Sequence, residues 1–320
     1  MEGPKCMWLE DNIPVIPQLS KGGSMSTSSS STYSTPDTLS CAAVHHETSR
    51  SAYETDLLSN LPKKELVDEL VSVYFSSTDV CQTTFRPVFY QSYQKLWETP
   101  PDQPINVPFL GVLFTAMANA VHCHPEAEGT NSGKARTAMD LYDRLSNQIT
   151  EDQRYNFHIE TVEATLLQAM FLLNEGKMNN AFLRMRIAIA VAHMIGLQRD
   201  PKVYKAKPLQ AERARRLWWK LYDMDRALSL FMGRPYTIID KFVDVEMPIP
   251  YDDGDISEGP DGDIIVDKSK TGKTVMYYRI YKYALPQLFL KIVLASQKML
   301  SPTSSITITP SSLQTIPKSL

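Results

Sequence analysis

The stretch ERARRLWWKLYDMDRALSLFMGRP, residues 212–235, decides how we expect the chain to fold. At helical spacing its apolar side chains fall on one wide stripe, which predicts a helix packed in a core. Gly233 can adopt the left-handed conformation that ends a helix and Pro235 cannot continue one, so the helix should end near Met232. The stripe consists of Trp218, Leu221, Tyr222, Leu228 and Met232, widened by Leu217, Met224 and Phe231.

One carboxylate lies on the same stripe, at Asp225. An unpaired charge there would cost several kcal/mol, so a buried ion pair is expected, with Arg226, Arg234 or Arg216 as the partner. Such a pair can be a catalytic carboxylate held by an arginine, or a polar contact that fixes how helices dock. No nearby nucleophile, histidine or glycine-rich loop completes a site, which favours the structural interpretation.

The order of residues in this stretch resembles the signature of the fungal-specific transcription factor domain, the regulatory middle homology region of fungal zinc-cluster (zinc binuclear cluster) transcription factors. An Arg-Arg pair, Trp-Trp, Leu-Tyr, Asp-Arg, Leu-Ser and Gly-Arg-Pro follow one another, and Asp240, Asp244 and Pro248 come after them. The signature residues, to which we assign structural roles, are Arg215, Arg216, Trp218, Trp219, Leu221, Tyr222, Asp225, Arg226, Leu228, Ser229, Gly233, Arg234 and Pro235.

Apolar periodicity predicts an all-α fold, a multi-helix bundle or irregular stack of about eight helices, with sheet a minor component at most. The helix at 179–195 is apolar nearly all round and should be central. Besides the signature helix, we expect helices at 63–75, 86–98, 106–123, 132–149, 158–175, 179–195 and 272–300.

The resemblance covers about 61–300, which we assign to the regulatory domain. Residues 1–55 are expected to be a disordered Ser/Thr-rich tail, since this composition cannot bury enough apolar surface to offset ordering. Residues 301–320 have a similar composition and are expected to be a second disordered tail. Order should begin near Leu61.

Charge is uneven along a chain whose formal net charge is only −3. The segment 205–220 is strongly basic and interrupted by one acid, Glu212, whereas 251–267 is acidic without a base. A solvated face and a solvated loop explain both segments. The alternative for the basic one is weak contact with DNA phosphates through Arg213, Lys220 and their neighbours.

The chain holds four widely spaced cysteines, which indicate a reducing compartment and neither a disulfide framework nor a metal cluster. We therefore expect no cofactor in this chain, although the resemblance implies that relatives bind zinc through a cysteine cluster absent here. His122-Cys123-His124 with Glu126 has metal-binding residue types, but neighbours on a helix do not face one point. No apolar run is long enough for a membrane helix, and the N-terminus does not resemble a secretory signal.

An enzyme is the least favoured class. Asp252-Asp253-x-Asp255 is similar to the magnesium-binding carboxylates of helical isoprenoid synthases, but Gly254 and Gly259 indicate a mobile loop and not a helix. Sequence motifs for nucleotide binding and for a serine nucleophile are absent. The chain is therefore expected not to be an enzyme.

The resemblance implies a nuclear regulator of RNA polymerase II transcription, often of a metabolic or secondary-metabolite gene cluster. Its expected partners are promoter DNA, contacted directly or through another protein, and a second copy or a zinc-cluster factor as a dimer. The alternative is a protein-interaction module that lacks DNA binding and pairs with a full-length zinc-cluster factor. Relatives usually continue beyond the last residue here, which leaves open a naturally short member or a gene that has lost an end.

Overall fold

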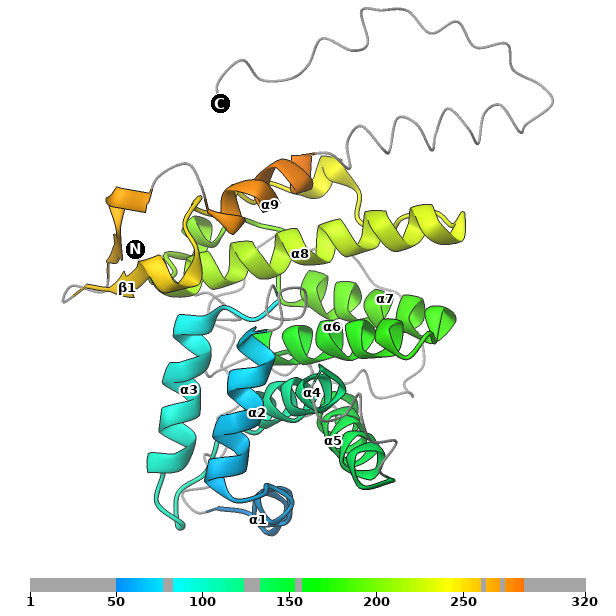
Figure 1. Cartoon of the computed structure of the whole chain (residues 1–320). Coiled ribbons are helices and arrows are strands. Elements are labelled where there is room, and N and C mark those ends of the chain that lie inside the picture. The colour runs from blue at the N-terminus through cyan, green and yellow to red at the C-terminus, as the bar shows by residue number, and fades with distance from the viewer. Residues whose placement is uncertain are drawn as a thin grey trace, which may run out of the picture.

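The computed structural model describes residues 50–76, 83–123, 133–152, 157–259, 263–270 and 274–284. These residues form mainly helices, with one small hairpin, so the predicted all-α fold is confirmed (Figure 1). The helices are α1 (Ala52–Ser59), α2 (Lys64–Ser76), α3 (Arg86–Glu98), α4 (Val107–Cys123), α5 (Gly133–Glu151), α6 (Ile159–Asn174), α7 (Met178–Met194), α8 (Pro208–Met232) and α9 (Val275–Ala284). In the hairpin, β1 (Ile256–Glu258) pairs antiparallel with β2 (Ile264–Val266), with Ile256 opposite Val266.

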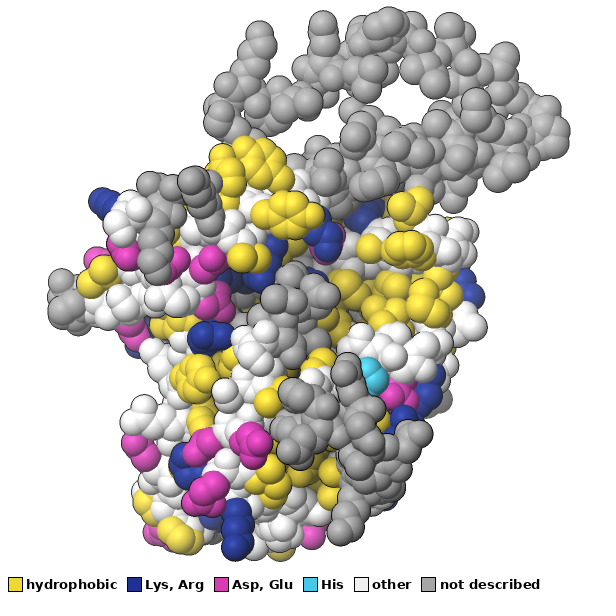
Figure 2. Space-filling view, in the orientation of Figure 1, with side chains coloured by type: hydrophobic (Ala, Val, Ile, Leu, Met, Phe, Trp, Pro, Cys, Tyr) yellow, Lys and Arg dark blue, Asp and Glu magenta, His cyan; other side chains and the backbone are white. Residues whose placement is uncertain are grey.

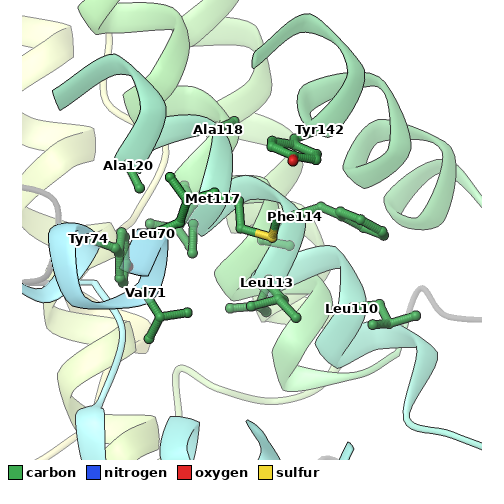
Figure 3. Packing of buried hydrophobic residues seen from close by; sticks show 14 of the residues in the cluster. Leu70, Val71, Tyr74, Leu110, Leu113, Phe114, Met117, Ala118, Ala120 and Tyr142 are labelled. Atoms are coloured by element: carbon green, nitrogen blue, oxygen red, sulfur yellow. The ribbon is translucent and has the colours of Figure 1, made fainter. Parts of the chain in front are cut away.

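The first half of the described chain packs around α4. Every residue from Val107 to Ala120 is buried, because α2, α5 and α6 cover α4 on different sides. Figure 3 shows side chains of α2, α4 and α5 interleaved in this cluster. Close packing here depends on Gly111, since a Cβ at that position would lie 3.3 Å from Cγ2 of Ile149.

The second half packs around α8, the signature helix, which lies across one end of the stack with α9 on its outer side (Figure 1). Its Trp218 is fully buried in a hydrophobic cluster formed mainly by α6, α7 and α8. The ring of Tyr283 in α9 stacks on Trp219, with ring centroids 6.1 Å apart. At the other end of the helix, Gly233 has φ 61°, so the predicted left-handed stop after Met232 is confirmed.

The helix boundaries agree closely with the periodicity, and α3 covers the predicted residues. Order does not begin near Leu61, however, because α1 starts at Ala52 inside the predicted tail. Ser51 and Glu54 cap this helix by hydrogen-bonding each other's backbone N–H groups, and the apolar Leu57 is fully buried. The predictions for 1–49, 285–300 and 301–320 lie outside the described residues.

Two predictions about burial are wrong. Phe231, in the last turn of α8, is 79% exposed. The predicted central helix, α7, is covered by α6 and α8 but leaves Leu183 at 62% exposed. In α9, Met276 and Tyr283 pack against the cluster around α8, while Tyr278 and Tyr281 face outward.

Candidate functional site: the charged network around α8

Charged side chains are buried along most of the length of α8. Each of seven such residues is exposed by 7% or less. Burial of a charge is tolerated when opposite charges and hydrogen bonds surround it. The seven residues are Glu212, Arg213, Arg216, Lys220, Asp223, Asp225 and Arg226.

Arg213 connects α8 to two carboxylates of α6. Its Nη1 lies 2.7 Å from Oε1 of Glu160, and its Nη2 lies 2.7 Å from Oε2 of Glu163. Burial raises the pKa of Glu163 by more than the guanidinium lowers it. At Glu160, where burial also acts to raise the pKa, the attraction of Arg213 prevails and the pKa falls below its usual value. One arginine therefore holds two acids in the interior.

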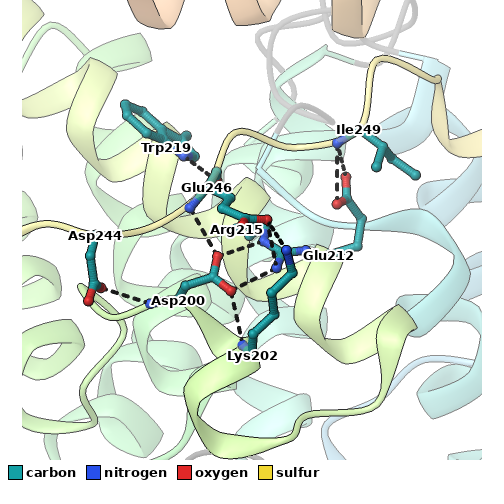
Figure 4. A network of polar contacts seen from close by, with 8 residues as sticks. All are labelled: Asp200, Lys202, Glu212, Arg215, Trp219, Asp244, Glu246 and Ile249. Atoms are coloured by element: carbon teal, nitrogen blue, oxygen red, sulfur yellow. Dashed lines mark hydrogen bonds and ion pairs between the residues drawn. The ribbon is translucent and has the colours of Figure 1, made fainter.

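Arg215 forms a two-point contact with Asp200 in the segment between α7 and α8 (Figure 4). The Nε and Nη2 atoms lie 2.9 and 2.8 Å from the two carboxylate oxygens. Asp200 also accepts hydrogen bonds from the backbone N–H groups of Lys202 and Glu246. Burial alone would raise the pKa of Asp200, but these bonds to its charged form bring the pKa below its usual value.

The extended segment after α8 folds back along the helix through the same network. The indole Nε1 of Trp219 donates to the backbone oxygen of Glu246 at 2.9 Å. Asp244 accepts from the backbone N–H of Asp200, which continues the network in Figure 4. The signature residues Arg215 and Trp219 thus fix the path of the segment that follows them.

Arg216 also binds three acceptors. Its Nε donates to Glu212 at 2.7 Å, and its Nη2 donates to the backbone oxygen of Tyr251 at 2.7 Å. Its Nη1 contacts Asp253, and the guanidinium lies 4.8 Å from the ring centroid of Phe85. A cavity of about 10 Å³ beside it is large enough for one water molecule and not for an effector.

The prediction that Asp225 forms a buried ion pair is wrong. Its carboxylate is fully buried, but it accepts hydrogen bonds from the backbone N–H groups of Thr237 and Ile238 at 2.8–3.1 Å. Burial raises the pKa of Asp225 despite these bonds. Backbone donors from the turn after α8 supply the partners that we expected from an arginine.

The neighbouring signature residues converge on Asp240 instead. Arg226 donates to the Asp240 carboxylate at 2.7 Å and to the backbone oxygen of Ile238 at 2.8 Å. The hydroxyl of Tyr222 donates to the same carboxylate at 2.8 Å, and burial raises the pKa of this tyrosine to about 12. Together with Asp225, these contacts hold the turn at 237–240 against α8.

The last signature residues join α8 to α7. Arg234, just past Gly233, donates to Oδ1 of Asn179, and Arg186 of α7 donates to the backbone oxygen of Pro235. All thirteen residues that we singled out as a structural signature thus lie within α8 or its C-terminal turn.

Four basic side chains of the segment 205–220 are not placed to contact DNA phosphates, whereas Lys205 and Lys207 are exposed. The guanidinium groups of Arg213, Arg215 and Arg216 are used in internal ion pairs, and Lys220 is only 5% exposed. Figure 4 shows Arg215 surrounded by acidic partners from the segments on either side of α8. The segment looks basic only because its acidic partners are distant in sequence.

The acidic segment is likewise part of the packing. Asp252 accepts hydrogen bonds from the backbone N–H groups of Val275 and Met276 at the start of α9. Asp253 accepts from the backbone N–H of Arg86 at the start of α3. These carboxylates stabilise helix N-termini, a role that favourable helix-dipole interactions explain.

Neither of the other sequence-based site candidates is assembled where the structure describes them. His122 Nδ1 lies 3.7 Å from Glu175, while His124 and Glu126 fall outside the described residues. Among the described residues, no three His, Cys, Asp or Glu side chains come together as metal ligands would. No helix in this part of the chain combines the length and apolarity that crossing a bilayer requires.

The acidic partners Glu160, Glu163 and Asp200 were missed by sequence reasoning. Glu160 and Glu163 occupy one face of α6 at i and i+3, interrupting an otherwise apolar helix. Two acids on one face of a mostly apolar helix indicate that a buried positive charge lies opposite them. Asp200 lies in a turn, where an acid is ordinary, and carried no such signal.

A scan against family models matches residues 71–316 to the fungal specific transcription factor domain. The match spans more than half of the chain and includes the whole of α8 with its charged network. The chain belongs to this family. The resemblance carried by the signature residues is therefore confirmed.

Curated relatives of this family member are themselves named as transcription factors. The equisetin cluster transcription factor of Fusarium heterosporum is 27% identical over 253 residues, which are 74% of this chain and 36% of that protein. The fusarisetin A cluster transcription factor of a Fusarium species is 26% identical over 74% of this chain and 33% of its own length. A Zn(2)-C6 fungal-type transcription factor of Macrophomina phaseolina is 25% identical over a stretch that covers 64% of this chain and 28% of that protein.

The family member thus spans about a third of the length of the curated relatives it matches. No solved structure matches it. The similarity covers the helical domain built around α8 and leaves most of each relative unmatched.

Proposed function

We propose that this chain regulates transcription by RNA polymerase II in the nucleus, as a fungal zinc-cluster type regulator of a metabolic or secondary-metabolite gene cluster. The family match over residues 71–316 carries the proposal. Two relatives that are named as cluster transcription factors support the link to secondary metabolism. The part that we assign to α8 is structural, since its signature residues hold the domain together.

We propose further that the described domain reaches promoter DNA through another protein, as a homodimer or as a heterodimer with a full-length zinc-cluster factor. The internal pairing of Arg213, Arg215 and Arg216 favours this route, because it removes three positive charges of the basic segment from the surface. A cofactor-free domain is part of the proposal, with zinc held by the partner.

Regulation is favoured over catalysis by the roles of the acidic segment. In a helical isoprenoid-type enzyme, Asp252 and Asp253 would face an enclosed cavity and bind magnesium. Here they accept backbone N–H groups at the starts of α9 and α3. We therefore propose that the chain is not an enzyme.

The test combines transcript profiling with a DNA-binding titration. Deleting the gene in its host should change transcripts of one contiguous gene cluster, and an unchanged transcriptome would contradict regulation. Purified chain, with its zinc content measured, should bind promoter DNA weakly until a zinc-cluster partner is added. Tight, sequence-selective binding by zinc-free chain alone would contradict the partner route.

A further inference from the structure

An apolar stripe on α7 lies exposed beside the signature helix. Leu183, Ile187 and Met194 are 62%, 49% and 53% exposed, and Ala190 between them is also exposed. Steps of four, three and four residues place these side chains on one face of the helix. The stripe extends for about 16 Å along α7 at the rise of an α-helix. A second helix can pack along such a seam.

Two arginines lie along the edge of this stripe that borders α8. The guanidinium groups of Arg186 and Arg234 lie 4.3 and 4.8 Å from the ring centroid of Phe182. Their hydrogen bonds go to the backbone oxygen of Pro235 and to Asn179, which are both uncharged acceptors. Within the described part of the chain neither arginine forms an ion pair, in contrast to the three arginines at 213–216.

We propose that the α7 stripe binds an amphipathic helix of another protein whose apolar side is flanked by Asp or Glu. Figure 2 shows hydrophobic side chains gathered over the C-terminal end of α8 and the helices beneath it. Leucine-sized side chains of the partner would cover Leu183, Ile187 and Met194, and its carboxylates would reach Arg186 and Arg234. The apolar part of this contact would cover the exposed stripe, and the charged part would give the two arginines carboxylate partners.

Charge argues against the two occupants that this chain itself could supply. A second copy would bring α7 against α7, and this helix contains arginines and no acid. Residues 285–300 are apolar, but their charged residues are Lys291 and Lys298. Either occupant would place positive charge beside Arg186 and Arg234.

The test uses two synthetic helical peptides of about 18 residues, a length at which an isolated helix can form. Both carry leucine at steps of four, three and four, flanked by glutamate in one peptide and by lysine in the other. Titration calorimetry with the purified chain should show the glutamate peptide binding at least about tenfold more tightly, since only its charges complement the two arginines. Equal binding of the two peptides, or no binding of either, would overturn the proposal.

Variants locate the binding site. Leu183→Gln and Arg234→Glu should each weaken binding of the glutamate peptide by about tenfold or more, as losses at the apolar and the charged half of the contact. Leu66→Gln on α2 and Lys95→Glu on α3 are matched exposed controls and should leave binding unchanged. Circular dichroism verifies that each variant is folded.

Two further results would overturn the proposal in favour of other occupants. A chain that is dimeric in solution and becomes monomeric with Leu183→Gln would assign the stripe to a second copy. Duplex DNA whose binding is lost with Arg234→Glu would assign the arginines to phosphates. Peptide binding is measured on the purified chain, so its failure leaves the transcription proposal intact and is distinguishable from it.

Discussion

The middle of α8 and the outer face of α7 contrast in how their residues are placed. On α8, charged side chains from Glu212 to Arg226 are buried among carboxylates, backbone groups and aromatic rings. On α7, the α-helix that precedes α8 in the chain, apolar side chains from Leu183 to Met194 are exposed. Residue type alone would place the two sets the other way round.

This difference shows that a charged side chain is buried where the domain supplies it with partners of opposite charge. Arg213 is stable inside the domain because its two terminal guanidinium nitrogens form ion pairs with Glu160 and Glu163. Arg186 and Arg234 form no ion pair among the described residues and lie beside an exposed apolar stripe. The buried network is complete within the chain, whereas the α7 face needs something from outside.

The largest effect should follow from breaking the network at its centre. Arg213→Met leaves two buried carboxylates without a counter-charge, which should lower the free energy of unfolding by about 3–5 kcal/mol. Urea denaturation followed by circular dichroism measures the loss. Arg144→Met, at an exposed site on α5, is the control and should change stability by no more than about 0.5 kcal/mol. A loss below about 1 kcal/mol for Arg213→Met would break the contrast between the regions.

A smaller effect should follow at Asp225, whose partners are backbone groups. Asp225→Ala leaves the N–H groups of Thr237 and Ile238 buried without an acceptor, at a cost of about 1–3 kcal/mol. Amide hydrogen exchange should become faster at these two residues. Asp225→Asn keeps one acceptor oxygen and should cost less. Unchanged exchange in the alanine variant would mean that the carboxylate is satisfied elsewhere.

The pH dependence of stability tests the contribution of another buried carboxylate, Asp200. Its pKa is lowered in the folded state, so its contribution is present above the unfolded value of about 3.9 and is lost as the pH falls through the folded value. Asp200→Asn should therefore be less stable at pH 7 and lose less stability on acidification. Denaturation at a series of pH values, beside exposed Asp56→Asn on α1, measures this. Parallel curves for Asp200→Asn and the parent would contradict it.

The smallest effect should be found on α7. Leu183→Gln and Ile187→Gln replace side chains that are already about half or more exposed, so the free energy of unfolding should change by no more than about 0.5 kcal/mol. Thermal melts of the two variants provide the measurement. A loss of 2 kcal/mol or more, the size expected for a core leucine, would show that the stripe is covered within the domain.

Most of the helices could be predicted from the sequence because apolar periodicity and stop signals are local. Gly233 and Pro235 place the end of α8, and burial of Trp218 follows from its stripe. Long-range pairing could not be predicted in this way. Asp225 gave no sign that its partners would be N–H groups twelve and thirteen residues further on.

The basic segment shows why the remaining part failed. Local charge predicted a solvated face, yet Arg213 meets acids about fifty residues earlier and Arg216 meets Asp253 well after it. The same limit applies to α7, whose composition predicted a central position although α6 and α8 cover only part of it. Which side of a helix is covered depends on topology, which no local pattern contains.

A double-mutant cycle between Arg213 and Glu163 tests the central claim most directly, since it measures whether the basic segment is bound internally. The cycle uses Arg213→Met, Glu163→Gln and both together, with unfolding free energies from urea titrations. The account predicts a coupling of about 2–3 kcal/mol, well above the 0.2–1 kcal/mol typical of exposed ion pairs. A coupling below about 0.5 kcal/mol would contradict it and return Arg213 to the surface.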